Sequence, residues 1–276
     1  MSEMTQWHDW KVVEILGRGS YGTVYRIERK DAFGHLEQSA LKVIRIPCGR
    51  EEYDAVLNEG MSQESAATYF RDIAKTITNE FSVMSRLKGH SNIVSMEDYD
   101  ARLLDDGYSW EISIRMELLT SLPKYFQKNP PTHNDIFRLA EDMCNAIERC
   151  ELNHIIHRDI KPENIFHTYA GDYKLGDFGI ARQLYNTSSA TMKRGTVSYM
   201  APEVFLGRHY DSTIDLYSLG IVLYRYLNNN RTPFLPPYPD DIRHTLYICT
   251  VQCSCCRRSS DPHFLPSASP TVSSSA

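Results

Sequence analysis

A glycine array near the start of the chain restricts the fold more than any other feature of the sequence. The stretch "LGRGSYGTVY", residues 16–25, contains Gly17, Gly19 and Gly22 in a spacing that two phosphate-binding architectures share and that ordinary turns also match. A dinucleotide-binding fold requires a helix after the glycines and an acidic residue about 20 positions farther on. Here the strand-like "TVYRIERK" follows, and the acidic position is occupied by Lys42. These features favour a hairpin that closes over a phosphate chain, with a plain β-turn as the alternative.

The rest of the chain changes from strand-like to helix-like segments. Apolar and β-branched runs at residues 11–16, 39–46 and 111–119 predict strands, and apolar positions at helical spacing predict one long helix over residues 65–89. The later apolar stripes are helical, and the strongest covers residues 212–228. This order predicts an α+β fold of two lobes, in which an antiparallel sheet and one long helix form the N-lobe and helices form most of the C-lobe.

Changes of pattern also predict the boundaries. We expect an N-terminal extension at 1–10, the N-lobe at 11–118, the C-lobe at 119–248 and a disordered tail rich in Cys, Ser and Pro at 249–276. After "TPFLPPYP" no amphipathic stripe appears, so we expect an incomplete C-lobe, cut short or ending in unrelated sequence. A zinc site at Cys253, Cys256 and His263 is a further hypothesis, although no second matched pair of ligands follows.

Composition argues against several classes of protein. The formal net charge of -5 argues against a nucleic-acid partner, because nucleic-acid binders show a basic excess. No run approaches the roughly 18 apolar residues of a membrane span, and the first residues lack the basic and apolar regions of a signal peptide. The odd number of cysteines, 7, favours reduced thiols over a disulfide framework. We therefore expect a cytoplasmic protein without a membrane segment, and the sequence leaves its oligomeric state open.

Lys42 and Glu80 form a predicted ion pair. Side chains alternate along a strand, so Lys42 shares an apolar face with Ala40 and Ile44, and its ammonium requires an anion there. An exposed lysine on an edge strand is the alternative. Glu80 lies on the inward stripe of the long helix, where an unpaired carboxylate would be costly. Pairing would satisfy both groups and hold the ammonium near a phosphate, whereas Glu64 is a weaker candidate because acids are common at helix starts.

Three motifs in the second half of the chain agree with a phosphate-binding function. "HRDIKPEN" occupies residues 157–164, "DFG" residues 177–179 and "GTVSYMAPE" residues 195–203. In this order and spacing they match the H-R-D-x-x-x-x-N, D-F-G and A-P-E signatures of protein kinases. The sequence resembles the eukaryotic-type (Hanks-type) serine/threonine protein kinases from about residue 11 to about residue 235, and details such as "YLNNNRTPFLP" resemble bacterial members.

The resemblance implies an enzyme that transfers the γ-phosphoryl group of Mg-ATP to Ser or Thr hydroxyls of proteins, a reaction that depends mostly on positioning and electrostatics. It makes Asp159 the base and places Lys161 beside the γ-phosphate. Asn164 and Asp177 become oxygen ligands of Mg²⁺, and Thr196 is expected to hydrogen-bond Asp159 and Lys161. The expected catalytic residues are Lys42, Glu80, Asp159, Lys161, Asn164 and Thr196, and the expected metal ligands are Asn164 and Asp177.

The resemblance also locates the ATP site. Backbone N–H groups of the glycine hairpin would close over the phosphates, and apolar side chains from both lobes would enclose the adenine. Met116 would be the gatekeeper, and the backbone of Glu117 and Leu118 would hydrogen-bond the adenine edge. The expected ATP-binding residues are Leu16, Gly17, Gly19, Ser20, Gly22, Val24, Ala40, Lys42, Met116, Glu117, Leu118, Phe166 and Asp177.

Arg158, next to the base, suggests activation by phosphorylation. A phosphate on the segment between Phe178 and Gly195 could pair with its guanidinium. The candidates are Thr187, Ser188, Ser189 and Thr191, and an ordinary solvated loop is the alternative.

Two other functions stay open at this point. One is a catalytically impaired, kinase-shaped scaffold or regulatory fragment, which an incomplete C-lobe would explain. The other is a small-molecule kinase of similar fold, although "GTVSYMAPE" resembles the peptide-docking segment of protein kinases. The expected partners are therefore ATP and protein substrates with Ser or Thr.

Overall fold

The computed structural model describes residues 7, 9–19, 22–178 and 197–234. Within these ranges, the side chains of residues 80, 82–84 and 197 lie outside the description. The chain divides into two compact units, residues 1–230 and residues 231–276. The elements below belong to the first unit, and of the second unit only residues 231–234 are described.

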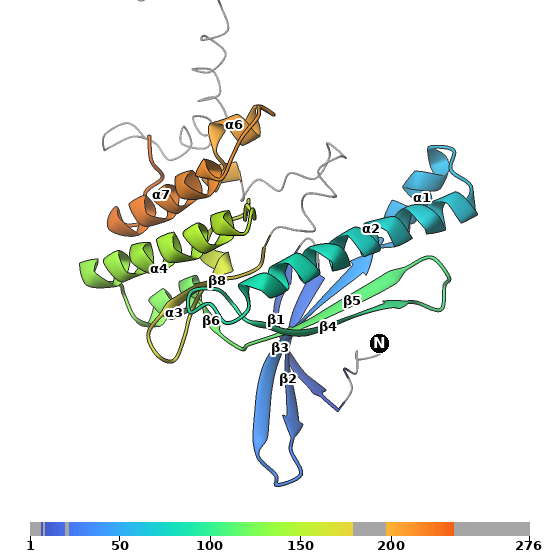
Figure 1. Ribbon diagram of the computed structural model, residues 1–276, viewed down its shortest axis with the longest axis horizontal. Coiled ribbons are helices and arrows are strands. Elements are labelled where there is room, and N and C mark those ends of the chain that lie inside the picture. Colours follow the sequence, from blue (N-terminus) through green and yellow to red (C-terminus); the bar gives the residue numbers. More distant parts are fainter. Residues whose placement is uncertain (1–6, 8, 20–21, 179–196, 235–276) are drawn as a thin grey trace, which may run out of the picture. The chain divides into compact units, whose positions relative to one another are not determined.

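A five-stranded antiparallel sheet forms the first part of this unit, in the order β1-β2-β3-β5-β4 (Figure 1). The β1–β2 hairpin pairs Gly19 with Gly22, so the glycine array lies at its turn as predicted. β3 and β5 are central and rich in β-branched residues, which pack well on a pleated surface. The strands are β1 (Lys11–Gly19), β2 (Gly22–Lys30), β3 (Leu36–Ile46), β4 (Met96–Leu103) and β5 (Trp110–Met116).

One face of the sheet is covered by the long helix α2 (Gln63–Met84). Its apolar stripe buries Phe70 and Ile77 against Ile44 and Ile112 of the sheet. The sequence predicted this helix to reach residue 89, but residues 85–87 form the 3-10 turn η1 (Ser85–Leu87) instead. A short preceding helix, α1 (Arg50–Asn58), was not predicted, and it packs through Tyr53, whose ring stacks on Tyr108 with centroids 3.8 Å apart.

The opposite face of the sheet holds residues from the very start of the chain. Trp7 and Trp10, within the stretch expected as an N-terminal extension, are buried and pack with Ile27, Leu41 and Val43. The guanidinium carbons of two arginines approach the Trp10 ring to 4.7 and 5.1 Å. Both faces of the sheet therefore carry an apolar layer.

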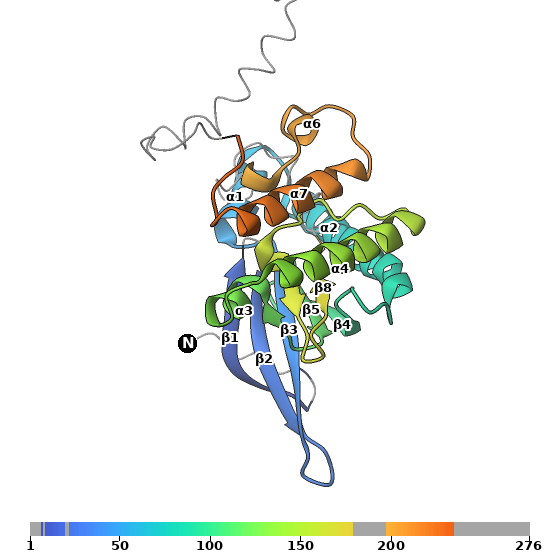
Figure 2. The ribbon, with the colours of Figure 1, turned by 90° about the vertical axis from the view of Figure 1, so that its left-hand side faces the viewer.

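The second part of the unit is mostly helical, and α4 and α7 lie side by side in it (Figures 1 and 2). Leu139 and Met143 of α4 and Val222 of α7 are completely buried in a common core. A capping box formed by Thr132 and Asp135 starts α4. The elements are β6 (Thr120–Ser121), α3 (Leu122–Lys128), α4 (His133–Leu152), η2 (Pro162–Asn164), β7 (Ile165–His167), β8 (Tyr173–Leu175), η3 (Val197–Tyr199), α6 (Pro202–Phe205) and α7 (Thr213–Leu227).

The predicted α+β fold of two lobes is confirmed in this part of the chain. β6, β7 and β8 form a second, three-stranded sheet in the order β6-β7-β8. Among the described residues, no helix combines the length and the apolar character that crossing a bilayer requires.

Candidate active site

Asp159, Lys161 and Asn164 form one hydrogen-bonded group in the loop between α4 and β7. Lys161 Nζ donates to Asp159 Oδ2 at 2.6 Å. Asn164 Nδ2 donates to the same Oδ2 at 3.0 Å and to the Asp159 backbone oxygen at 2.8 Å. The Asp159 side chain is only 12% exposed, and these two donors fix the direction of its carboxylate. The structure therefore brings these three predicted residues together.

A buried carboxylate on α7 fixes the backbone of this loop. Asp215 Oδ2 accepts a hydrogen bond from the His157 N–H at 2.7 Å, and Oδ1 accepts one from the Arg158 N–H at 2.8 Å. Arg158 has a φ of 66°, in the left-handed region that is unfavourable for residues with a Cβ. Burial raises the pKa of the Asp215 carboxyl above its ordinary value, and the two backbone donors offset only part of that effect. Asp215 thus holds the loop that carries Asp159 in a strained conformation.

His157 connects the same loop to the segment before Asp177. The Asp159 N–H donates to His157 Nδ1 at 3.3 Å, so Nε2 carries the proton and donates to the Gly176 carbonyl at 3.0 Å. The imidazole is buried, and burial lowers its pKa, which keeps it neutral. Phe178 packs 4.5 Å from the imidazole ring, centroid to centroid. His157 is the first residue of the motif "HRDIKPEN", but no role was predicted for it.

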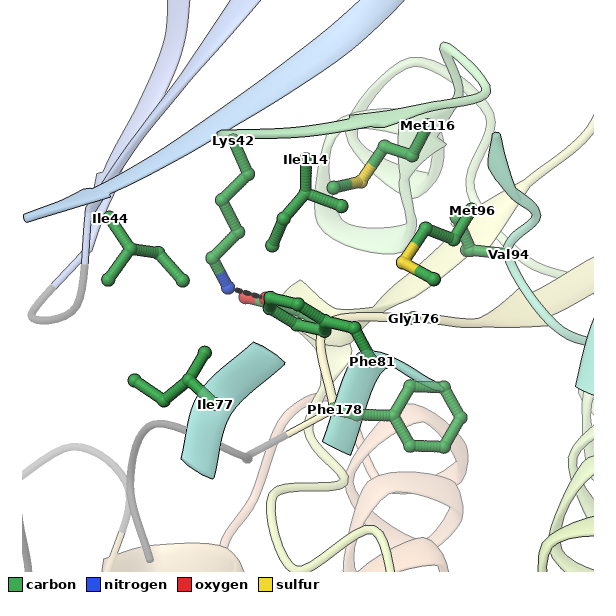
Figure 3. Close-up of a pocket in the computed structure, with 11 residues that line it drawn as sticks. Lys42, Ile44, Ile77, Phe81, Val94, Met96, Ile114, Met116, Gly176 and Phe178 are labelled. Atoms are coloured by element: carbon green, nitrogen blue, oxygen red, sulfur yellow. Dashed lines mark hydrogen bonds and ion pairs between the residues drawn. The ribbon is translucent and has the colours of Figure 1, made fainter. Parts of the chain in front are cut away.

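Lys42 and Asp177 form an ion pair between β3 and the segment after β8 (Figure 3). Asp177 has a φ of 56°, which turns its carboxylate toward the lysine. Burial raises the pKa of the Asp177 carboxyl, but the charge of Lys42 and its hydrogen bond outweigh burial, so the net shift is downward. The predicted pairing of Lys42 with Glu80 stays a prediction, because the Glu80 side chain lies outside the described part.

Two glycines are required by close packing around the site. A Cβ on Gly22, whose φ is 151°, would lie 2.2 Å from the Val43 carbonyl oxygen, so the hairpin can approach β3 only without a side chain. A Cβ on Gly176 would lie 2.5 Å from Val94 Cγ2 and 3.1 Å from the Phe166 ring. Phe166, which is expected below the adenine, therefore packs against the backbone of Gly176, the residue before Asp177.

The residues expected at the adenine edge lie where β5 ends. Ala40 of β3 is paired with Met116 of β5. The Glu117 N–H donates to the Ser95 carbonyl at 3.2 Å. Because this N–H is occupied, we expect the backbone of Glu117 to contact the adenine through its carbonyl group. Its carboxylate accepts from the Ser95 N–H at 2.6 Å and from Lys174 Nζ at 2.8 Å, a link from β5 to β8 that the sequence did not predict.

A cavity of about 60 Å³ lies next to the ion pair (Figure 3). Apolar side chains of the sheet and of α2 line one side of it, and the segment with Asp177 and Phe178 lines the other. Of the residues expected around the adenine, Met116 lines this cavity. The cavity therefore lies beside three residues expected at the nucleotide site, Lys42, Met116 and Asp177.

Several predicted residues lie outside the described part of the chain. These are Ser20, Thr196, the phosphorylation candidates Thr187, Ser188, Ser189 and Thr191, and the proposed zinc ligands Cys253, Cys256 and His263. Among the described residues, no group of three or more His, Cys, Asp and Glu side chains is arranged to hold a metal ion.

Comparison with known proteins agrees with this geometry. The family model described as protein kinase domain matches residues 10–270. The chain is 28% identical to serine/threonine-protein kinase AtPK2/AtPK19 of Arabidopsis thaliana over 237 residues, which cover 82% of this chain and 42% of that protein. It is 30% identical to serine/threonine-protein kinase shk2 of Schizosaccharomyces pombe over 246 residues, 87% of this chain and 36% of that protein. The chain thus spans less than half the length of these two relatives.

Proposed function

The chain belongs to the protein kinase family, and from that premise we propose that it transfers the γ-phosphoryl group of Mg-ATP to Ser or Thr hydroxyls of protein substrates, including its own segment before Gly195. One observation carries the proposal: the hydrogen-bonded group of Asp159, Lys161 and Asn164 is held by the same backbone that connects to the Lys42–Asp177 ion pair.

Asp159 is the group that accepts the proton of the substrate hydroxyl. Its carboxylate accepts hydrogen bonds from Lys161 and Asn164, and Asp215 anchors the backbone that carries it. Lys161 Nζ lies 2.6 Å from the Asp159 carboxylate. Its ammonium is therefore close enough to stabilise the charge on the phosphoryl oxygens where the substrate hydroxyl attacks. Lys42 supplies a second cation from the sheet.

The oxygens on this side fit a Mg²⁺ ion. Asn164 uses its amide nitrogen toward Asp159, which leaves its amide oxygen as the group that can reach a cation. The pKa of Asp177 is lowered, so its carboxylate is charged at neutral pH, as a hard cation requires. When bound, Mg²⁺ supplies neutralisation of phosphate charge.

Two observations support a protein substrate with Ser or Thr. The matched relatives are named serine/threonine-protein kinases. Lys161 also follows Asp159 by two positions, in the arrangement that resembles the Ser/Thr branch. The net charge of -5 supports the absence of nucleic acid among the partners.

The test is phosphate transfer from γ-labelled Mg-ATP to a generic protein substrate. Asp159→Asn and Lys42→Met serve as inactive variants. Asp72→Asn, on the exposed side of α2, is the control and should transfer phosphate at the wild-type rate. Phosphoamino-acid analysis of the product should yield phosphoserine and phosphothreonine. Transfer by the wild type that does not exceed transfer by Asp159→Asn would refute the proposal, and phosphotyrosine as the main product would refute the substrate class.

A further inference from the structure

Arg225, in the last turn of α7, is a cation for which the described residues provide no anionic partner. Its Nη1 donates to the Tyr199 hydroxyl at 2.5 Å, and its guanidinium carbon lies 5.3 Å from the centroid of that ring. Its Nε is buried and has no hydrogen-bond partner among the residues that the structure describes. Over the ranges that the structure describes, no carboxylate lies within ion-pair distance of this guanidinium. Holding a half-buried guanidinium against one neutral phenol is costly, and an incoming anion would offset that cost.

Tyr199 places this cation beside the catalytic loop. The ring is buried, its hydroxyl is held by Arg225, and its carbonyl accepts a hydrogen bond from Ser218 Oγ at 2.7 Å, so α7 fixes it at both ends. Burial raises the pKa of the Tyr199 phenol, the Arg225 charge lowers it, and the Glu163 charge raises it. Glu163 is the residue before Asn164, so the loop that carries Asp159 and the Arg225 guanidinium act on the same ring.

A protein substrate must bring residues close to this position. Its target hydroxyl has to reach Asp159, so the residues on either side of that hydroxyl lie on the surface next to the catalytic loop. Glu163 is exposed there and would repel an acid. Solvent screens the exposed Glu163 charge more strongly than the half-buried charge of Arg225, so the net preference is set by the arginine.

We propose that Arg225 is a specificity-determining residue that selects protein substrates with an acidic side chain, from Asp, Glu or a phosphorylated residue, near the target hydroxyl. A carboxylate or phosphate can accept hydrogen bonds from a guanidinium in its planar fork, which an amide of the same shape cannot match in charge. The inference rests on the proposed kinase function and adds a substrate class to it.

The experiment uses a neutral parent peptide with one central Ser, in which a single Asp is moved through the flanking positions, with an Asn series of the same shape beside it. kcat/KM is measured for the wild type, Arg225→Gln, Arg225→Lys and Tyr199→Phe, and Arg149→Gln on the exposed side of α4 is the matched control. We expect the wild type to favour Asp over Asn at one position by about tenfold, as for a charge-assisted hydrogen bond. Arg225→Lys, Tyr199→Phe and Arg149→Gln should keep most of this preference, and Arg225→Gln should reduce it to about onefold.

The outcomes separate a recognition role from an anchoring role. If Tyr199→Phe loses the preference as fully as Arg225→Gln does, Arg225 acts only by holding the ring and the proposal is wrong. A wild type without preference for Asp at any position, or an Arg225→Gln variant that retains it, overturns the proposal as well. If Arg225→Gln does not fold, the wild-type ratio of kcat/KM between Asp and Asn peptides decides. This ratio must fall with rising salt if a cation binds the acidic side chain.

Failure of the kinase function is recognised separately. If no peptide is phosphorylated above the Asp159→Asn background, the proposed function fails, and the same Asp and Asn peptides are then compared by fluorescence anisotropy binding. An equal affinity of the wild type for both series would overturn the role of Arg225, and a preference for Asp that Arg225→Gln abolishes would support it.

Discussion

Asp215 Oδ2 accepts a hydrogen bond from the backbone N–H of His157 at 2.7 Å, and this bond ties α7 to the loop that carries Asp159, the proposed base. The two residues are 58 positions apart in the chain, and both are almost completely buried. The geometry of the loop around Asp159 therefore depends on a carboxylate that is buried beneath that loop.

Asp215→Asn should lower both stability and activity. The asparagine keeps one acceptor but turns an N–H₂ group toward a backbone N–H, so a buried donor loses its partner. We expect the free energy of unfolding to fall by about 2–4 kcal/mol and the rate to fall by at least about tenfold. Urea unfolding and initial rates would measure these effects. Asp211→Asn, an exposed residue just before the same helix, is the control and should cost less than about 1 kcal/mol; an equal loss for both would contradict this account.

Gly176→Ala should disturb the position of Asp177. The added Cβ would lie 2.5 Å from Val94 Cγ2, so the segment or the valine has to move, at a cost of about 1–3 kcal/mol in unfolding free energy. ATP affinity should weaken together with stability. The double variant with Val94→Ala should recover part of both, and the absence of any recovery would show that the valine is not the obstacle.

Gly22→Ala should be more harmful than Gly19→Ala. At Gly22 the new Cβ would meet the backbone oxygen of Val43 at 2.2 Å, whereas at Gly19 the nearest atom is 3.8 Å away. Because a backbone atom cannot rotate aside, we expect Gly22→Ala to lose at least about 1 kcal/mol more stability than Gly19→Ala. Thermal unfolding of the two variants side by side checks this order, and a reversed order would refute the hairpin packing.

Stability should fall as the solution becomes mildly acidic. Burial lowers the pKa of His157 below its unfolded value, so below about pH 6.5 the unfolded chain binds a proton that the folded chain does not. The contribution of His157 to the free energy of unfolding is fully present above that pH. It is lost as the pH falls, by at most about 1.4 kcal/mol per pH unit for one histidine. His90 and His167, whose pKa values burial also lowers, act with the same sign, and Asp215, whose pKa is raised, acts with the opposite sign.

Comparison with His157→Gln isolates the share of His157. In urea unfolding between pH 7.5 and 5.5, the free energy of unfolding of this variant should fall less steeply than that of the wild type. The difference in slope should correspond to about one proton fewer taken up on unfolding. Identical slopes would show that His157 titrates alike in the folded and unfolded chain.

The sequence predicted the elements whose signals are local. The helical stripe from Ala66 to Ile77 predicted α2, and the glycine spacing predicted the β1–β2 hairpin, because each follows from periodicity or turn chemistry within a short window. The short helix α1 was missed because its apolar stripe is limited to Tyr53, Val56 and Leu57, which is too short to stand out as a periodic pattern.

Contacts between distant residues could not be predicted in the same way. Motif spacing identified Lys42 and Asp177 as site residues, but their contact joins positions 135 apart, and periodicity carries no information about such a pair. The Glu117–Lys174 and Arg225–Tyr199 contacts likewise depend on how helices and strands pack. The late C-lobe and the phosphorylation segment stay predictions, since they lie outside the described residues.

The most direct test of the central claim is the rate of γ-phosphoryl transfer by Asp159→Asn at saturating Mg-ATP, measured together with its ATP affinity. Asparagine keeps the size and most hydrogen bonds of the aspartate but cannot accept the substrate proton. We predict an ATP affinity within about threefold of the wild type and a rate lower by about 10²–10⁴-fold. A variant that binds ATP and transfers phosphate at the wild-type rate would contradict the assignment of Asp159 as the base.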